Sequence, residues 1–183
     1  MRVLPTELEG PMLIEPTVHG DARGFFLETF REQVFGDLGV AERWVQDNHS
    51  RSRQGVLRGI HFQPGMAKLV RCARGEILDV LVDLRRGSPD FGRSEAVALD
   101  DVSHRQLYCP DGFGHGFCVL SEEADVVYRC SAYYDPELEA GIHYADPALG
   151  IVWPELELTV SARDQAAPLL AEAADRLPFE YSS

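Results

Sequence analysis

The ten-residue run EILDVLVDLR, residues 76–85, constrains the fold of this chain more than any other stretch. Successive side chains of a strand point to opposite faces, so one face of this run is wholly aliphatic and the other carries two aspartates. Two acids on a half-apolar face are either exposed to solvent or directed into a polar cavity. The aliphatic face consists of Leu78, Val80, Val82 and Leu84, and the mixed face of Ile77, Asp79, Leu81 and Asp83.

Other short runs of strand-forming residues follow along the chain, separated by turns rich in glycine, proline, aspartate or serine. Short strands at this spacing predict an all-β fold, an antiparallel sandwich or barrel. Proline near the end of the first run suggests that this strand lies at a sheet edge. We expect strands at residues 12–19, 25–30, 44–49, 56–62, 69–72, 93–99, 105–109, 115–120 and 125–134, and turns at 20–24 and 50–54.

Helices are expected only near the two ends of the chain. Residues 31–38 are typical of a short helix that ends near Gly39. The segment Ser161–Asp164 predicts a helix start with an acid at its third position, followed by a helix over Gln165–Arg176. No repeat or linker divides the sequence, and we therefore interpret residues 1–183 as a single domain with enough length to bury a core.

The charge of the chain excludes some classes of partner. The formal net charge of -13 argues against general binding to nucleic acid or to anionic membranes. It still permits an anionic small molecule, because the charge inside a pocket can oppose that of the whole chain. No apolar run reaches 18 residues, so the sequence predicts no membrane span.

The cysteines and the N-terminus indicate a compartment. The first ten residues carry early acids and no long apolar segment, which is not the pattern of a secretory signal. No two cysteines form a C-x-x-C pair, and each lies in an apolar, strand-like run. We therefore expect reduced, mostly buried thiols in a cytoplasmic protein. The four cysteines are Cys72, Cys109, Cys118 and Cys130.

The stretch from Gly55 to Lys68, GVLRGIHFQPGMAK, carries the chemistry of the sequence. Arg58 and His61 have opposite parity on a regular strand, but glycine inside a strand often marks a bulge. A bulge at Gly59 could turn both side chains to one side and set a base beside an anion-binding group. The alternative is a surface strand with ordinary polar residues.

Eight segments of the chain, in order and at matching spacing, resemble one family. They are DARGFFLETF (21–30), QDNHSRS (46–52), GVLRGIHFQ (55–63), AKLVRCARGEILDVLVDLRRGSPDFG (67–92), LYCPDGFGHGF (107–117), VVYRCSAYY (126–134), DPALGIVWP (146–154) and LTVSARD (158–164). The chain resembles the dTDP-4-dehydrorhamnose 3,5-epimerases, which are cupin jelly rolls that act on nucleotide-linked 4-keto sugars. Two features depart from the family. The turn Pro64–Met66 is shorter than usual, and Arg163 stands where lysine is frequent.

The resemblance implies catalytic roles for four residues. His61 is expected to remove the proton next to the ketone, and Asp164 to pair with the other ring nitrogen of His61 within hydrogen-bond reach. Tyr128 is expected to return a proton on the opposite face, and Lys68 to lie near the C4 oxygen. Considered without the family pattern, Tyr128 would be a core aromatic residue and Asp164 a helix-capping residue.

The resemblance also implies a set of substrate contacts and a mode of assembly. It implies no cofactor, no metal, and a homodimer with strand exchange near the N-terminus, in which the strand around 25–30 covers an open sheet edge. We expect Arg23, Arg58, Lys68 and Arg163 to converge on one cavity, and Asp79 to form a second polar pair with His115. The residues expected to contact the nucleotide diphosphate or the sugar are Arg23, Glu28, Gln46, Asn48, Arg58, His115, Glu139 and Arg163.

Epimerisation next to a ketone requires the residue types that this pattern supplies. A histidine has an unperturbed pKa of about 6.5, which suits a base at neutral pH. An acid is needed on the other face, and a cation must meet the oxyanion that develops at the ketone. The expected reaction converts dTDP-4-dehydro-6-deoxyglucose to dTDP-4-dehydrorhamnose.

Three alternatives remain open at the level of sequence. A monofunctional 3- or 5-epimerase of another deoxysugar pathway would keep much of the same motif set. A metal-dependent cupin oxygenase or isomerase is disfavoured, because His61-Phe62-Gln63 replaces an H-x-H pair and His61 with His115 supplies only two ligands. A non-catalytic binding cupin would keep the arginines and lose the base or the acid, and both are present.

Overall fold

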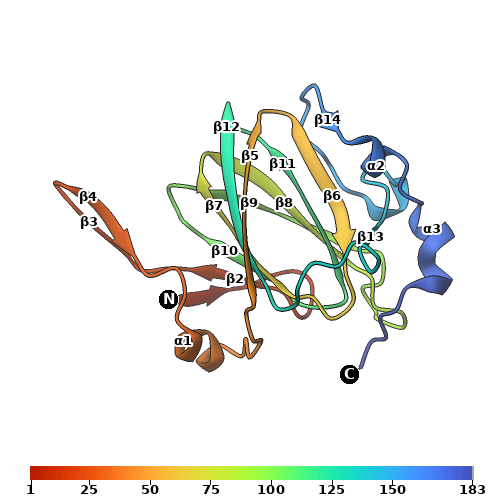
Figure 1. Cartoon of the computed structure of the whole chain (residues 1–183), viewed down its shortest axis with the longest axis horizontal. Coiled ribbons are helices and arrows are strands. Elements are labelled where there is room, and N and C mark those ends of the chain that lie inside the picture. The colour runs from red at the N-terminus through yellow and green to blue at the C-terminus, as the bar shows by residue number, and fades with distance from the viewer. Residues whose placement is uncertain (183) are drawn as a thin grey trace.

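Two antiparallel sheets packed face to face form the body of the molecule, in a computed structural model that describes residues 1–182 (Figure 1). The first sheet has the order β1 (Arg2–Leu4), β2 (Met12–Glu15), β10 (Gln106–Cys109), β7 (Lys68–Arg74), β12 (Glu123–Cys130) and β5 (Gln46–Arg53). The second has the order β13 (Ala140–Gly141), β6 (Val56–Phe62), β11 (Phe113–Val119), β8 (Glu76–Asp83) and β9 (Ser94–Asp100), and β14 (Thr159–Val160) pairs with β6 in parallel. The predicted all-β jelly roll with short terminal helices is confirmed.

The strand β8 shows why this sandwich has a core on both sides of its second sheet. Ile77 and Leu81 are buried between the two sheets. Val80 and Val82 are buried on the opposite face, against the C-terminal segment. The alternation predicted for residues 76–85 is therefore confirmed, and both of its faces are buried.

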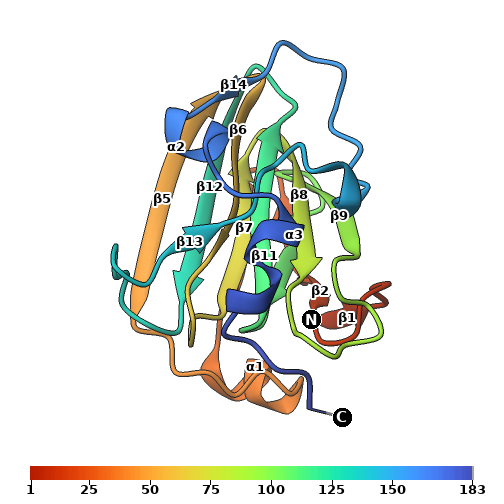
Figure 2. The same cartoon turned by 90° about the vertical axis from the view of Figure 1, so that its right-hand side faces the viewer.

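The C-terminal segment covers the second sheet, as Figure 2 shows with α2 (Ala162–Gln165) and α3 (Leu170–Ala173) in front of it. A continuous helix over 165–176 is wrong. Pro168 separates α2 from α3 because proline lacks the N–H that a helix interior uses, and the short 3₁₀ helices η1 (Pro147–Leu149) and η2 (Ala174–Arg176) complete the segment. The helix start predicted at Ser161 is confirmed as the start of α2, since the Asp164 N–H donates to the Ser161 hydroxyl at 3.1 Å.

The N-terminal region departs from the first sheet as a projecting hairpin (Figure 1). The predicted strand 12–19 is wrong as a single element, because it is interrupted at Pro16 and Thr17. The β2 part joins the sheet, while β3 (Val18–Asp21) pairs only with β4 (Gly24–Leu27). The predicted helix after the hairpin is confirmed as α1 (Glu32–Asp37).

Some other boundaries also differ from the sequence-based prediction. The turn expected at 50–54 is wrong, because β5 continues to Arg53 as an edge strand whose polar side chains alternate between solvent and interior. The strand expected at 125–134 ends at Cys130, and the one at 25–30 ends at Leu27. Among residues 1–182, no helix is both long and apolar enough to cross a membrane.

The irregularity expected at Gly59 is confirmed and has a steric cause. The pairing of β11 with β6 changes register between His115 and Phe117. Gly59 has a φ of 138°, and a Cβ added there would lie 2.5 Å from the Cα of Gly116. Only glycine permits this close approach, which brings Arg58 and His61 to the same side of the strand.

We expect Gly59→Ala to lower the free energy of unfolding by at least about 2 kcal/mol, because backbone atoms must move and the φ angle is strained. Gly36→Ala is the control, since it lies in α1 with open space around it and should stabilise the protein by up to about 1 kcal/mol. Urea unfolding measures both variants. Equal stability of Gly59→Ala and the wild type would contradict the steric argument.

Candidate active site

A cavity of about 510 Å³, here called the inner cavity, lies between the two sheets. Side chains from β5, β7 and β12 of the first sheet and from β6 and β11 of the second line it, with residues that precede and begin α2. Eight of the predicted site residues meet there. They are Arg58, His61, Lys68, His115, Tyr128, Glu139, Arg163 and Asp164.

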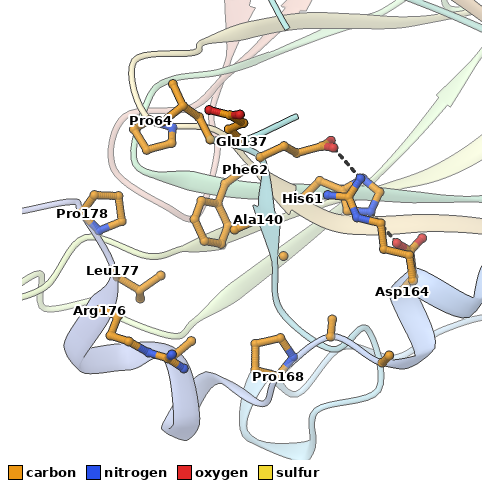
Figure 3. A pocket seen from close by; sticks show the side chains of 17 residues that line it. His61, Phe62, Pro64, Glu137, Ala140, Asp164, Pro168, Arg176, Leu177 and Pro178 are labelled. Carbon is orange, nitrogen blue, oxygen red and sulfur yellow. Dashed lines mark hydrogen bonds and ion pairs between the residues drawn. The ribbon is translucent and has the colours of Figure 1, made fainter. Parts of the chain in front are cut away.

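The predicted pairing of His61 with Asp164 is confirmed. The His61 Nε2 atom lies 2.7 Å from Asp164 Oδ1, across 103 residues of sequence (Figure 3). Asp164 is 5% exposed, and its backbone N–H is held by the Ser161 hydroxyl. A carboxylate on one ring nitrogen fixes the tautomer of the imidazole and supports its cationic form. The other ring nitrogen then remains available to act as a base.

A second histidine–aspartate pair lies deeper between the sheets, as expected. His115 Nε2 lies 2.9 and 3.0 Å from the two carboxylate oxygens of Asp79, and both residues are buried. His115 stands directly opposite His61 in the pairing of β11 with β6. Asp79 on the mixed face of β8 is therefore directed into the interior, where its charge has a partner.

Tyr128 and Lys68 enter the inner cavity from the first sheet. Burial raises the pKa of the Tyr128 hydroxyl, so the phenol stays protonated at neutral pH. Lys68 pairs in register with Cys109 on one side and Cys130 on the other. Burial raises the pKa of Cys109 to about 12 and also raises that of Cys130, so neutral thiols flank the ammonium group.

Polar residues around the cavity rim form two hydrogen-bonded groups, the rim network of Arg163, Glu139 and Tyr134 and a separate pair of Arg58 and Ser52. The Arg163 guanidinium donates to Glu139 Oε2 at 2.5 Å, and the Tyr134 hydroxyl donates to the same oxygen at 2.9 Å. Arg58 donates to the Ser52 hydroxyl at 3.1 Å. The rim thus carries two guanidinium groups, which bind oxyanions in a bidentate way.

A smaller cavity of about 290 Å³, here called the side cavity, shares Lys68, Tyr128 and Glu139 with the inner cavity. Gln46 and Asn48, two of the residues predicted to contact the substrate, line it. Their amides also bond within the protein, because Gln46 Nε2 donates to Asn48 Oδ1 at 3.1 Å. The predicted site is therefore distributed over two adjoining cavities.

Two predicted site residues lie elsewhere in this chain. Arg23 is on the projecting hairpin, with a side chain that is 90% exposed and paired with Asp21. Glu28 follows the hairpin and pairs with Arg31. The expectation that four cations converge holds for Arg58, Lys68 and Arg163, which all line the inner cavity, but Arg23 does not reach it within one chain.

A third cavity of about 680 Å³, the outer cavity, is lined by His61 and Asp164 together with the C-terminal segment. Figure 3 shows His61 and Asp164 at one side of it and Pro168, Leu177 and Pro178 of the C-terminal segment at the other. Its lining is mostly apolar. Tyr128, Lys68 and Arg58 all line the inner cavity instead.

The residues that could bind a metal are arranged in separate pairs. Within residues 1–182, no group of three or more His, Cys, Asp or Glu side chains is placed to hold a metal ion. His61 and His115 each have an aspartate of their own.

Sequence reasoning missed the role of Gln63, which it treated only as a replacement for a metal ligand. It gave no role to Tyr134. Both residues line the side cavity. Their contacts, described below, are made with distant backbone groups or with Glu139, and no local motif signals such contacts.

Comparisons with known proteins agree with this geometry. A family model described as dTDP-4-dehydrorhamnose 3,5-epimerase matches residues 5–172. The chain is 48% identical over 178 residues to the dTDP-4-dehydrorhamnose 3,5-epimerase of Salmonella typhimurium, covering 94% of this chain and 97% of the relative. It is also 48% identical over 179 residues to the dTDP-4-dehydrorhamnose 3-epimerase of Streptomyces niveus, covering 96% and 86%.

The structure is similar to that of a dTDP-6-deoxy-D-glucose-3,5-epimerase from Legionella pneumophila, solved in complex with dTDP-4-keto-L-rhamnose. The TM-score is 0.96 at 45% sequence identity, and the match covers 100% of this chain and 99% of that one.

The rim network makes stability depend on pH through Glu139. Burial acts to raise the pKa of this carboxyl, but hydrogen bonds from Arg163 and Tyr134 outweigh it and lower the pKa. A carboxyl whose folded-state pKa is depressed adds stability above its unfolded pKa of about 4.3, and this is lost as the pH falls through the folded-state value.

Glu139→Gln should therefore lower the free energy of unfolding at pH 7 by up to about 1 kcal/mol, and the difference should vanish in strong acid. Urea unfolding at a series of pH values measures this. Glu137→Gln is the control, because Glu137 lies nearby in the same connection and is exposed. A Glu139→Gln difference that stays constant with pH would refute the linkage.

Proposed function

Because the chain belongs to the dTDP-4-dehydrorhamnose 3,5-epimerase family, we propose that it inverts a dTDP-linked 4-keto-6-deoxyhexose at the carbons that flank the ketone. The reaction is the conversion of dTDP-4-dehydro-6-deoxyglucose to dTDP-4-dehydrorhamnose, and residues 1–183 act as one domain. The observation that carries this proposal is the 2.7 Å pair of His61 and Asp164 in the same cavity as Tyr128 and Lys68.

The reaction begins with removal of a proton from carbon. His61 takes the proton from the carbon next to the ketone, and the C–H electron pair moves to form an enolate with its charge on the C4 oxygen. Lys68 stabilises that oxyanion, an effect for which loss of one donor typically costs about 3 kcal/mol. Asp164 stabilises the imidazolium that forms.

The reaction ends with protonation from the other face. The Tyr128 hydroxyl gives its proton to the carbon, and the enolate electrons re-form the ketone. The imidazolium of His61 then releases its proton to solvent, and solvent restores the proton of Tyr128. One base serves both carbons if the sugar ring turns over between steps, because both carbons flank the same carbonyl.

The diphosphate and the nucleotide are bound at the rim. Arg58 and Arg163 supply bidentate donors in a chain whose total charge is -13. The complex of the Legionella relative with dTDP-4-keto-L-rhamnose supports a dTDP-linked sugar as the ligand.

Incubation of the protein with dTDP-4-keto-6-deoxyglucose in D2O, followed by NMR, tests the proposed function. We expect deuterium at both C3 and C5. Deuterium at C3 alone would identify a 3-epimerase, which is the activity given for the Streptomyces niveus relative. If neither carbon exchanges its proton, the proposal is refuted.

Variants of the acid and the base should separate exchange from inversion. His61→Ala should lower deuterium exchange at every invertible carbon by about 10²–10⁴-fold, because it removes the base. Tyr128→Phe keeps the ring and should retain exchange while net inversion falls. Asp164→Asn should retain part of the activity, since the imidazole remains.

His49→Ala is the control for these variants, because His49 is 59% exposed and pairs with Asp125 outside the three cavities. It should exchange deuterium at the wild-type rate. Exchange by His61→Ala at the wild-type rate would place the base elsewhere.

The assembly proposed here is a homodimer in which hairpins cross between chains. The hairpin exposes Phe25 and Phe26, at 60% and 70%, and such apolar residues on a projecting element favour a protein partner. The strand β5 is the open edge of the first sheet and lines both cavities that hold the proposed chemistry. Addition of a partner's β4 to this edge would cover it and deliver Arg23 and Glu28 to the cavity mouth.

Phe26→Asp should convert the dimer to a monomer, because it places a charge in the apolar contact. The monomer should be less active, because it lacks the partner's hairpin at the cavity mouth. Val152→Asp is the control, since Val152 is 84% exposed in the connection between η1 and β14, away from the hairpin, and should leave the dimer intact. Analytical ultracentrifugation measures the mass of each. A monomeric wild type, or a dimeric Phe26→Asp protein, would contradict hairpin exchange.

We also propose a cytoplasmic location. All four cysteines are free and buried, and burial raises the pKa of Cys72 to about 12. Neutral, unpaired thiols fit a reducing compartment.

A further inference from the structure

The connection between β12 and β13 carries a short stretch, Tyr133–Asp135, here called the tyrosine segment. We propose that Gln63 is a positioning residue that holds this segment in place and thereby sets the affinity for the nucleotide-sugar ligand. The proposal rests on the proposed function for the identity of that ligand. It goes beyond it by assigning a role to a residue that touches neither the reacting carbon nor the base.

Gln63 uses both ends of its amide on the tyrosine segment. Its Nε2 donates to the carbonyl oxygen of Tyr133 at 2.9 Å, and its Oε1 accepts from the backbone N–H of Asp135 at 2.9 Å. Gln63 is 5% exposed, so its own amide is largely shielded from competing water. The two bonds bracket Tyr134, whose backbone lies between them.

A second glutamine completes the clamp. The backbone N–H of Tyr134 donates to Gln46 Oε1 at 2.9 Å. Three successive residues are therefore held through side-chain amides, in a stretch that belongs to no helix or strand. The glutamine side chains therefore satisfy backbone groups that a neighbouring strand would satisfy in a sheet.

Packing does not hold the tyrosine segment. Tyr133 is 72% exposed and Tyr134 is 49% exposed, so neither side chain is anchored in a core. The position of the segment therefore depends on its hydrogen bonds. Two of the three hydrogen bonds from side-chain amides to its backbone come from Gln63, which follows directly after β6 and lies two residues from His61.

The position of the tyrosine segment affects the rim of the cavities through the side chain of Tyr134. The Tyr134 hydroxyl donates to Glu139 at 2.9 Å, and Glu139 also accepts from Arg163 at 2.5 Å. If the segment moved, Tyr134 would leave Glu139, and the orientation of Arg163 would lose one of its supports. Gln63 thus acts on the ligand through Tyr134 and the rim, while the reacting groups on β6 and β12 stay in place.

Only glutamine satisfies the geometry at this position. Asparagine is one methylene shorter, and glutamate has no donor for the carbonyl of Tyr133. Methionine has nearly the same length and volume and neither hydrogen bond, so Gln63→Met isolates the clamp from the packing. Gln54→Met is the matched control, since the Gln54 amide also donates to a backbone carbonyl, that of Leu120 at 2.7 Å, outside the cavities.

Steady-state kinetics with dTDP-4-keto-6-deoxyglucose and calorimetry with dTDP test the role in binding. Gln63→Met should raise KM and the Kd for dTDP by about tenfold and leave kcat within about threefold, because loss of the clamp affects binding and not chemistry. Gln54→Met should change neither. An unchanged KM, or a loss confined to kcat or to thermal stability, would overturn the proposal.

A double-variant cycle tests the route through Tyr134. Tyr134→Ala alone should raise the Kd for dTDP, and adding Gln63→Met should cause little further loss, because the two residues act as a unit. Additive losses would mean that Gln63 acts by another route and would overturn the proposal.

Hydrogen exchange separates failure of this inference from failure of the proposed function. The N–H groups of Tyr134 and Asp135 should exchange faster in Gln63→Met than in the wild type, whatever substrate the protein uses. Unchanged protection would refute the clamp even in an active epimerase. Faster exchange in Gln63→Met, found together with a wild type that neither binds dTDP nor epimerises, would refute the function and the affinity role and would leave the clamp itself established.

Discussion

The hydrogen bond between His61 and Asp164 is the interaction on which the arrangement of the site depends. It joins the C-terminal end of β6 to the first turn of α2 across 103 residues. The parallel pairing of β14 with β6 brings the two segments together, and Ser161 then caps α2 through the N–H of Asp164. Close approach of β6 to β11 at Gly59 turns His61 toward the same cavity. Backbone contacts therefore determine where His61 and Asp164 lie and which cavity they line.

The charges of the site oppose the charge of the chain. The net charge is -13, yet Arg58, Lys68 and Arg163 all face the inner cavity. The aspartates buried there are each committed to a histidine, Asp164 to His61 and a second one to His115. Local potential decides what a cavity binds, and here it suits an anionic ligand although the outer surface repels other anions.

Two physical means position groups around this site. Strand-borne residues such as His61 and Tyr128 are fixed by sheet hydrogen bonds and by a core with fully buried aliphatic side chains. The exposed Tyr134 is fixed instead by side-chain amides that bond to its backbone. Polar clamps of this kind hold a loop in one position without burying it, so the loop stays at the surface where a ligand reaches it.

The sequence by itself determined the fold class and much of the site. Alternation in residues 76–85 and short strands between turns required an antiparallel β fold, since the side-chain period is a local property of the chain. The start of α2 at Ser161 could also be predicted, because capping is local and involves residues three positions apart. Family resemblance added the pairing of His61 with Asp164, which no local pattern contains.

Only the tertiary structure decided where the elements end and which distant groups meet. Pro168 divided a predicted helix, and the edge strand β5 continued through a predicted turn, because packing overrides local preference at boundaries. Arg23 lies on a hairpin that leaves its own chain's cavities, and Gln63 binds backbone groups about seventy residues away. Such contacts depend on which segments the fold brings together, and they involve backbone atoms that every residue shares, so residue types alone do not reveal them.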